Sequence, residues 1–378
     1  MYNNGKQILF GFYNGKFISK GYFDNNLIFN SNVVTITINP TPNYAKVTFS
    51  DYGIGIISND GKSITVKKDT VINYTVSADK YVSKTQSIVV DSTKSINVSL
   101  NKIMYTLTIE PTPSDATVTL TASGYNQSGN SITVESGTTV SYNVSYPELQ
   151  SVSGTYVVNS TEVKHITLKY PSGTVLFESS TPGNYNITPL VPVNCNVICV
   201  GGGAGGTSVY GYGIHVISCA AAYAGGGSGG YSNTNVSLNN IQYPITVGAG
   251  GNKSVYNFNN DKSYTLNGNS GSQSSLSNLV SAGGGNAGSA YAKVDHYGSF
   301  HDNSASSTAG TGGSGVTANG NNGSNDKYVA SSHYTGYKAV AGGASVYGGY
   351  GAGGNAEIND GTAKAANGTA GYVKIVTL

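Results

Sequence analysis

Clusters of glycine recur through the second half of the chain and limit what it can fold into. Of the 378 residues, 52 are glycine, and most of these lie beyond residue 174. Residues with ordinary side chains separate the clusters, so the region does not have the composition of a flexible linker. Glycines grouped in this way indicate backbones packed so closely that a Cβ atom would not fit between them. The clusters are GGGAGG (201–206), GGGSGG (225–230), GAGG (248–251), GGGNAG (283–288), GTGGSG (310–315) and GGASVYGGYGAGG (342–354).

The composition argues against ionic partners. Charged residues make up 10% of the chain, the net charge is +2, and every basic residue other than histidine is a lysine. Arginine is the usual side chain for bidentate contacts with phosphates and base edges, so its absence disfavours nucleic-acid binding. Tyrosine is abundant, with 29 residues, among many Asn, Ser and Thr. Such an uncharged polar surface suits contacts with carbohydrate or protein.

The three cysteines give no sign of a disulfide framework or a metal site. Cys195 and Cys199 lie four residues apart in PVNCNVICV (192–200), which reads as a strand. On a strand they share one face and lie about 13 Å apart, which is too far for a disulfide. We expect both to be buried small hydrophobic residues. Cys219 could pair with either, and no Cys/His spacing matches a zinc site, so no cofactor or metal is predicted.

The N-terminal stretch contains a short repeat, with units at 2–11, 12–21 and 22–30. Each unit has an aromatic start, an Asn-Gly or Asp-Asn turn and a short apolar run, which predicts small strands. We expect three strands in a meander over 1–32, too small to be stable alone and therefore an attachment module. The stretch lacks the pattern of a signal peptide. No apolar run is long enough for a transmembrane helix, so no membrane insertion is expected.

Residues 33–101 and 102–170 read as two copies of one domain. VTITINPTPNYAKVTF (34–49) aligns with YTLTIEPTPSDATVTL (105–120), and GKSITVKKDTVINYTVS (61–77) aligns with GNSITVESGTTVSYNVS (129–145). Alternating apolar and polar residues between turn signals predict two small β-sandwiches. The copies resemble PEGA-type and bacterial Ig-like repeats, and this resemblance implies spacers or contact modules.

Residues 171–378 carry an ordered set of motifs. They are PGNYNI (182–187), NVICVGGGAGG (196–206), GGGSGGYSNTNVSL (225–238), YPITVGAGG (243–251), SSLSNLVSAGGG (274–285) and GTAGYVKIVTL (368–378). In this order they resemble the glycine-rich domain of phage tail and fibre proteins, and the chain is similar to the tip adhesins of T-even-like phages. The resemblance implies polyglycine helices stacked into a sandwich, with loops between them that bind the host receptor.

Elementary backbone chemistry supports such a lattice. A polyproline-II-type helix has three residues per turn and no internal hydrogen bonds, so its N–H and C=O groups need partners in neighbouring segments. We therefore predict a mainly β protein whose C-terminal domain is a polyglycine-II-type sandwich with edge strands. The stretches 252–282 and 316–341 have few clustered glycines, and we expect the lattice to be interrupted there.

Insertions between the clusters carry the bulky side chains. They span 207–219, 252–264, 289–303 and 325–338, and loops on a rigid scaffold are a usual place for binding residues. Tyrosine-rich loops contact partners at low entropic cost. The alternative is that these tyrosines only cap the lattice. The predicted receptor-binding residues are Tyr210, Tyr212, His215, Tyr291, His296, Tyr297, Phe300, His301, Tyr328, His333, Tyr334 and Tyr337.

No catalytic constellation is recognisable, so we predict that the protein is not an enzyme. The carboxylates of the glycine-rich region are scattered rather than paired, as a glycosidase would need, and Asp295-His296 with His301-Asp302 lacks a metal-binding spacing template. The preferred function is a surface fibre or tip protein of a phage virion, bound to other virion proteins through 1–32. Its partner would be a host protein or glycan. The alternatives are a structural or decoration fibre of head or tail, and a bacterial cell-surface adhesin. Fibres are often trimers, whereas a glycine lattice can complete itself within one chain.

Overall fold

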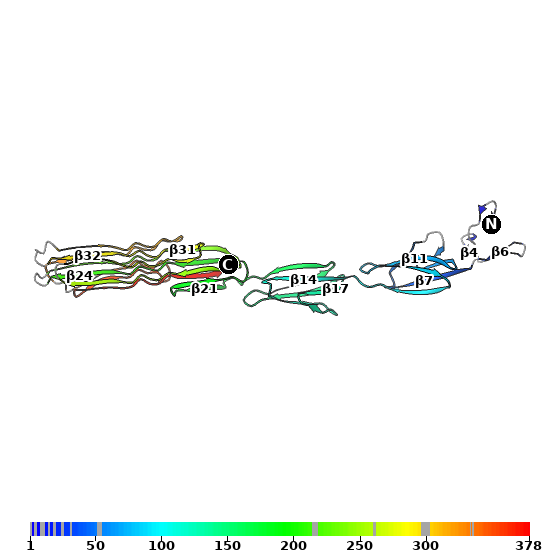
Figure 1. The fold of residues 1–378 in the computed structure, drawn as a ribbon, viewed down its shortest axis with the longest axis horizontal. Helices are drawn as coiled ribbons and strands as arrows, with labels where there is room; N and C mark the ends of the chain where they lie inside the picture. The colour runs from blue at the N-terminus through cyan, green and yellow to red at the C-terminus, as the bar shows by residue number, and fades with distance from the viewer. Residues whose placement is uncertain are drawn as a thin grey trace. The chain divides into compact units, whose positions relative to one another are not determined.

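The computed structural model describes residues 2–378 apart from 4–5, 8–11, 14–15, 18–19, 24–25, 31, 51–54, 214–217, 260–261, 296–302, 333 and 335. The described residues form strands and extended segments but no helix, so the predicted mainly β class is confirmed (Figure 1). Nothing in this described part is therefore a helix that could cross a lipid bilayer. By Cα proximity the chain divides into two compact units, 1–110 with 118–144 and 153–166, and 111–117 with 145–152 and 167–378.

The N-terminal repeat forms separate hairpins rather than one meander. The described residues of the repeat form three two-stranded antiparallel sheets, each with a turn sequence between its strands, and the third sheet begins at Lys20, before the third unit. The expectation of three strands in one meander is therefore corrected. The strands are β1 (Tyr2–Asn3), β2 (Lys6–Gln7), β3 (Phe12–Tyr13), β4 (Lys16–Phe17), β5 (Lys20–Phe23) and β6 (Asn26–Asn30).

The first internal copy is a pair of sheets around one core. Along β7, Val34, Ile36 and Ile38 are buried and alternate with more exposed threonines, as the sequence pattern predicts. They share a core with Ile72 and Tyr74 of the second sheet. One sheet has the order β13-β7-β10-β9 and the other β12-β11-β8. The bounds are β7 (Val33–Thr41), β8 (Lys46–Phe49), β9 (Gly55–Ile57), β10 (Ser63–Lys67), β11 (Thr70–Ser77), β12 (Lys84–Val90) and β13 (Lys94–Ser99).

The second internal copy repeats this topology strand for strand. Its sheets have the orders β20-β14-β17-β16 and β19-β18-β15, which correspond one to one with those of the first copy. The aligned prolines also match, since Thr41-Pro42 and Thr112-Pro113 are both cis. The bounds are β14 (Met104–Thr112), β15 (Thr117–Thr121), β16 (Gln127–Ser128), β17 (Ser131–Glu135), β18 (Thr138–Ser145), β19 (Val152–Val158) and β20 (Glu162–Thr167).

The glycine-rich region begins with another two-sheet sandwich, which we call the base sandwich. Its sheets have the orders β21-β38-β23-β26 and β22-β27-β30-β31. Cys195, Val197 and Cys199 point into its core, so the prediction that these two cysteines are buried is confirmed. The bounds are β21 (Val175–Ser179), β22 (Gly183–Ile187), β23 (Val193–Val200), β26 (Tyr231–Leu238), β27 (Tyr243–Val247), β30 (Ser274–Leu276), β31 (Val280–Ala282) and β38 (Tyr372–Thr377).

Beyond the base sandwich, extended glycine segments bond to one another in a lattice. Along 201–206, successive amides donate to three different neighbouring segments, and every third amide returns to the same neighbour. A period of three is that of a polyproline-II-type helix. The six bonds pair Gly201 with Gly230, Gly202 with Ser272, Gly203 with Thr369, Ala204 with Gly227, Gly205 with Asn269, and Gly206 with Ala366, at 2.9–3.0 Å.

Segments 201–206 and 225–230 are central because neighbours surround them. Segment 201–206 also accepts bonds from Gly251, Gly285 and Gly354, which lie on three further segments. A Cβ added at Gly202 would lie 2.0 Å from the carbonyl oxygen of Ala249, and one at Gly203 would lie 2.0 Å from that of Ala352. Almost every position of a central segment therefore has to be glycine, which explains the densest clusters of the sequence.

The outermost segments of the lattice, such as 268–273 and 319–324, carry glycine at only every third position. Gly320 and Gly323 face the central segment 225–230, where an added Cβ would lie 2.1 Å and 2.3 Å from backbone oxygens. Gly271 faces 201–206 in the same way. The sequences around 268–273 and 319–324 are therefore part of the lattice. The expected interruption is wrong there, because single glycines spaced by three are sufficient at the edge.

Beyond the lattice lie three layered sheets, which we call the tip block. Figure 1 shows β24 and β32 at the end of this unit away from the C-terminus, with β21 and β31 nearer to it. The middle sheet, β28-β24-β25-β34, is covered by β29-β32-β33 on one face and by β35-β36-β37 on the other. The bounds are β24 (Thr207–Gly213), β25 (Ser218–Ala224), β28 (Ser254–Asn259), β29 (Lys262–Asn267), β32 (Ser289–Val294), β33 (Ser304–Thr308), β34 (Asn325–Ala330), β35 (Tyr337–Val340), β36 (Ala356–Asn359) and β37 (Thr362–Ala365).

Candidate functional site

The insertions expected to be surface loops contain the strands of the tip block. This is a correction, and its physical reason is that side chains longer than a hydrogen need a place to pack once the glycine lattice ends. Half of the predicted receptor-binding residues lie among the described residues. The other half lie outside the described residues, namely His215, His296, Tyr297, Phe300, His301 and His333.

Tyr210 is a core residue, which corrects its assignment to the contact surface. It lies in β24, in the middle layer, and its side chain is 1% exposed. It packs with Tyr223, Ala221 and Ile358 between the middle sheet and the sheet that contains β36. Burial raises the pKa of Tyr210 to about 12. Tyr212 is half-buried on the same face, with its ring 6.4 Å from that of Tyr210.

Tyr328 and Tyr334 lie together where β34 meets β35. Tyr337 and Glu357 lie on the outer face of the sheet β35-β36-β37, because the alternate residues Lys338 and Ile358 face the middle sheet. We call this region, with its two neighbouring faces, the tyrosine rim and define it as Asp326, Tyr328, Tyr334, Tyr337, Lys338 and Glu357. The ring of Tyr328 lies edge-on to that of Tyr334, with centroids 4.9 Å apart. Tyr337 is 62% exposed, and its hydroxyl donates to Glu357 Oε2 at 3.1 Å. The rim therefore offers aromatic faces together with hydrogen-bonding groups.

Charged groups of the tyrosine rim hold one another in place. Lys338 Nζ lies 5.3 Å from the centroid of the Tyr328 ring and 3.8 Å from Asp326 Oδ2. Asp326 also accepts a 2.8 Å hydrogen bond from the hydroxyl of Tyr223, whose pKa is raised by burial and by this carboxylate. Since the Lys338–Asp326 pair is about half exposed, it orients the side chains more than it stabilises the fold.

Tyr291 lies on the opposite side of the tip block. Its neighbours in β32, Ala290 and Ala292, point into the core beneath the middle sheet, so alternation turns Tyr291 outward. In register it is flanked by Thr265 of β29 and Ser306 of β33. The structure therefore places Tyr291 on a hydroxyl-bearing sheet face, separate from the tyrosine rim.

Sequence reasoning missed a column of stacked tyrosines beside the base sandwich. Tyr231 and Tyr372 begin the strands that flank Val200, and a tight turn inserts Tyr347 beside both of them. Tyr350 also stacks on Tyr372, with centroids 4.4 Å apart and planes 8° from parallel. The sequence signal for this turn was the pair Gly348-Gly349 between two tyrosines. Both glycines have positive φ in the turn.

The column is anchored by one carboxylate. Tyr372 donates to Glu178 Oε1 at 2.6 Å, and Lys374 Nζ lies 3.1 Å from Glu178 Oε2. These two bonds lower the pKa of Glu178. Because the rings cover one another's faces, we infer that the stacked tyrosines hold segments 341–345 and 352–355 against the base sandwich.

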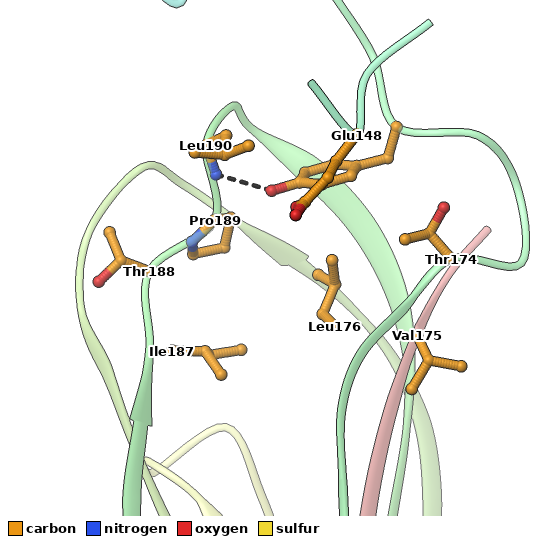
Figure 2. Close-up of a pocket in the computed structure, with 9 residues that line it drawn as sticks. Glu148, Thr174, Val175, Leu176, Ile187, Thr188, Pro189 and Leu190 are labelled. Atoms are coloured by element: carbon orange, nitrogen blue, oxygen red, sulfur yellow. Dashed lines mark hydrogen bonds between the residues drawn. The ribbon is translucent and has the colours of Figure 1, made fainter. Parts of the chain in front are cut away.

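A cavity of about 280 Å³ lies at the end of the base sandwich (Figure 2). In this view Glu148 and Leu190 lie at one side, and Val175 and Ile187 lie toward the other. The backbone N–H of Leu190 donates to the hydroxyl of Tyr170 at 2.8 Å. None of the predicted contact residues lines the cavity, and a single carboxylate beside apolar groups does not define a ligand class.

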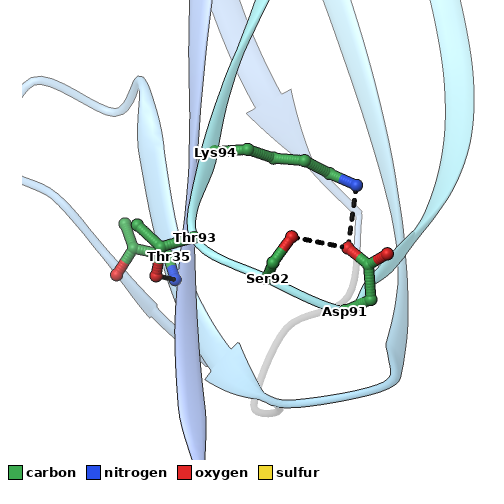
Figure 3. A network of polar contacts seen from close by, with 5 residues as sticks. All are labelled: Thr35, Asp91, Ser92, Thr93 and Lys94. Atoms are coloured by element: carbon green, nitrogen blue, oxygen red, sulfur yellow. Dashed lines mark hydrogen bonds and ion pairs between the residues drawn. The ribbon is translucent and has the colours of Figure 1, made fainter.

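The sandwich copies show a polar network that is structural. In the first copy, the N–H of Thr35 donates to Thr93 Oγ1 at 3.1 Å, and Asp91 accepts from Ser92 and Lys94 (Figure 3). The hydrogen bond from Lys94 lowers the pKa of Asp91. The second copy repeats the backbone bond, since Thr106 N donates to Thr161 Oγ1 at 3.3 Å. A bond shared by both copies supports the turn before β13 and β20 rather than a binding site.

The described residues show no arrangement typical of metal or thiol chemistry. No three of the described His, Cys, Asp or Glu side chains gather in a way that could hold a metal ion. Burial raises the pKa of the Cys195 thiol to about 11 and that of Cys199 to about 12, and it also raises the pKa of Cys219. All three thiols therefore stay protonated near neutral pH.

The lattice and its flanking sheets define a glycine-rich scaffold that presents two tyrosine-bearing surfaces. Residues 179–376, more than half of the chain, match the family described as the glycine-rich domain. The chain therefore belongs to this glycine-rich domain family. No curated protein matches the sequence.

Proposed function

We propose that this chain is a fibre or tip protein of a phage virion that binds a host-surface receptor through its tip block. The observation that carries the proposal is the tyrosine rim, where an exposed tyrosine and two half-buried ones lie on or beside β34 and β35 at the end of a stiff lattice. Binding residues held on rigid elements lose little conformational entropy when a partner docks.

The rest of the chain fits a role in display. The two sandwich copies have the same topology, and their described residues form no recognisable site, so we assign them as spacers of the PEGA or Ig-like type. We assign residues 1–32 to docking on other virion proteins. The receptor would be a protein or glycan that is contacted without strong charge attraction, because the net charge of the whole chain is only +2.

Cell binding by the full-length chain tests the proposal. Tyr328→Ala and Tyr337→Ala should each weaken binding of labelled protein to host cells by about tenfold or more, as expected for tyrosine hot spots. Tyr291→Ala on the opposite face tests whether the second surface contributes. Tyr44, which is 69% exposed in the first sandwich copy, provides the matched control, and Tyr44→Ala should leave binding unchanged.

The alternatives predict other results. Unchanged binding in all the tip-block variants would contradict the proposed site. A chain that is found in purified particles by mass spectrometry but does not bind cells would instead be a structural or decoration fibre. A chain that is made by a bacterium and carried on its own surface would be a cell-surface adhesin.

A further inference from the structure

Side-chain oxygens cap the outer edge of the lattice. An outer segment has amides that point away from the central segments, and these would otherwise have no partner in the protein. Asn, Ser and Thr side chains on the adjacent segment accept hydrogen bonds from them. The recipients and their caps include Ala341 with Ser324, Gly342 with Asn355, Ala352 with Thr369, and Ala287 with Ser270, at 2.7–3.1 Å.

Three further caps are asparagines followed by glycine, and they share one geometry. Asn319 Oδ1 accepts from the N–H of Gly315 at 3.2 Å, while the N–H of Gly320 donates to the carbonyl of Gly313 at 2.7 Å. The side-chain oxygen and the following amide therefore bind the same neighbouring segment, two residues apart. Both groups of the Asn-Gly pair are held by this segment.

The other two pairs repeat the arrangement with the same spacing. Asn322 Oδ1 accepts from Gly312, and the next amide donates to Gly310 O, both at 2.9 Å. Asn367 Oδ1 accepts from Lys253 at 2.8 Å, and the next amide donates to Gly251 O at 2.9 Å. The recurrence on two separate segments, 319–324 and 366–371, makes this a motif of the lattice edge.

Asn-Gly is also the sequence in which an asparagine is chemically most exposed to attack by the next backbone nitrogen, because glycine has no side chain to hinder it. In that reaction the glycine nitrogen loses its proton and bonds to the asparagine Cγ, and the side-chain nitrogen leaves as ammonia. Water then opens the resulting succinimide at either carbonyl. The net change is asparagine plus water to aspartate or isoaspartate plus ammonia.

We propose that Asn319, Asn322 and Asn367 are latent deamidation sites that the lattice holds closed. Attack requires the nitrogen and Cγ to approach in a near-attack geometry. Here the nitrogen's proton is engaged by a carbonyl of the neighbouring segment, and the Oδ1 atom fixes the side-chain amide toward the same segment. Each site can react only when the two segments separate, so its rate reports local opening of the lattice.

Opening followed by reaction has a lasting structural consequence. Isoaspartate places one additional carbon in the main chain, which shifts every following amide out of the three-residue period. The segment then cannot return all its amides to the same neighbours. Aspartate, by contrast, keeps the Oδ1 acceptor and adds a negative charge.

Peptide mapping of the intact full-length chain tests the inference. The protein and synthetic peptides of 316–326 and 362–372 are incubated in H₂¹⁸O at pH 8, and label in Asp and isoAsp is followed at the three sites. We expect rates in the native protein to be at least about tenfold lower than in the peptides. Protein unfolded in guanidinium should react at the peptide rates.

Amide exchange supplies a second readout of the same opening. Hydrogen exchange at Gly320, Gly323 and Gly368 should slow together with deamidation, and both should accelerate in parallel as denaturant is added below the unfolding transition. Native deamidation at the peptide rate would overturn the inference. So would slow deamidation in native protein whose three glycine amides exchange freely.

Discussion

Gly203→Ala is expected to disrupt the lattice at its centre. The new Cβ would lie 2.0 Å from the carbonyl oxygen of Ala352 and 2.6 Å from that of Gly351, and both contacts are with backbone. Ordinary contacts begin at about 3.4 Å, so the neighbouring segment would have to move by more than 1 Å. Backbone segments cannot rotate out of the way as a flexible side chain can.

The magnitude follows from the hydrogen bonds that such a movement would break. Segment 351–354 accepts from Gly229 and Thr369, and its Gly354 amide donates to Ala204 O, at 2.7–2.9 Å. Leaving a buried backbone group unpaired costs about 1–3 kcal/mol. Loss of two or three bonds therefore lowers the free energy of unfolding by about 3–6 kcal/mol. For a domain of this size the melting temperature should fall by about 6 °C or more.

Calorimetry of the full-length chain measures the effect, with Gly183→Ala as the matched control. Gly183 lies in β22 of the same domain, and its added Cβ would meet only the Tyr185 side chain at 3.4 Å, an ordinary contact. This control should change stability by less than about 1 kcal/mol. If the free energies of unfolding of Gly203→Ala and Gly183→Ala differ by less than about 1 kcal/mol, close packing of the lattice is not the cause of the glycine clusters.

Other consequences can be measured separately. Tyr210→Ala should lower the free energy of unfolding, measured by calorimetry, by about 3–5 kcal/mol, because the side chain of Tyr210 is buried. Tyr337→Ala should change this free energy by about 0.5 kcal/mol or less. Similar losses in the two variants would contradict the difference in burial. The folded pKa of Glu178 lies below its usual 4.5, so its stabilisation is present above that value and lost as pH falls. Glu178→Gln should therefore flatten the acid limb of melting temperature against pH, and an unchanged limb would contradict this. Cys195 and Cys199 should resist a thiol reagent at pH 8 until the protein unfolds, because both are buried with raised pKa values; rapid reaction in the native state would contradict this.

The sequence alone was sufficient to predict the lattice and the two internal copies, because close packing and alternation leave strong local signals. Glycine at nearly every position of 201–206 is what a backbone surrounded by other backbones requires, and an open loop has no such requirement. The outer segments were harder to recognise, since 319–324 reads NGNNGS and resembles a loop. Its glycines are required only where they face a central segment, and this direction depends on neighbours that are distant in the sequence.

The strands of the tip block were predicted to be surface loops for a related reason. In β25, SCAAAYA is buried at every residue, since the middle sheet is covered on both faces. Such a strand shows no alternation, and the aromatic residues beside it look like surface residues of a loop. Burial of Tyr210 depends on the sheet formed by β35, β36 and β37, whose strands lie more than 120 residues later.

A spacing rule connects the lattice to its edge. In a helix with three residues per turn, a central segment has neighbours on all sides and tolerates a side chain at almost no position, as in 201–206. An outermost segment such as 319–324 has one row of residues against the centre and two rows facing outward. Its outward rows are therefore free to carry Asn, Ser and Thr, and these cap the outward amides of the next segment. The polar residues that suggest disorder in this sequence complete the hydrogen bonding of the lattice, so replacing them with glycine would leave edge amides without a partner.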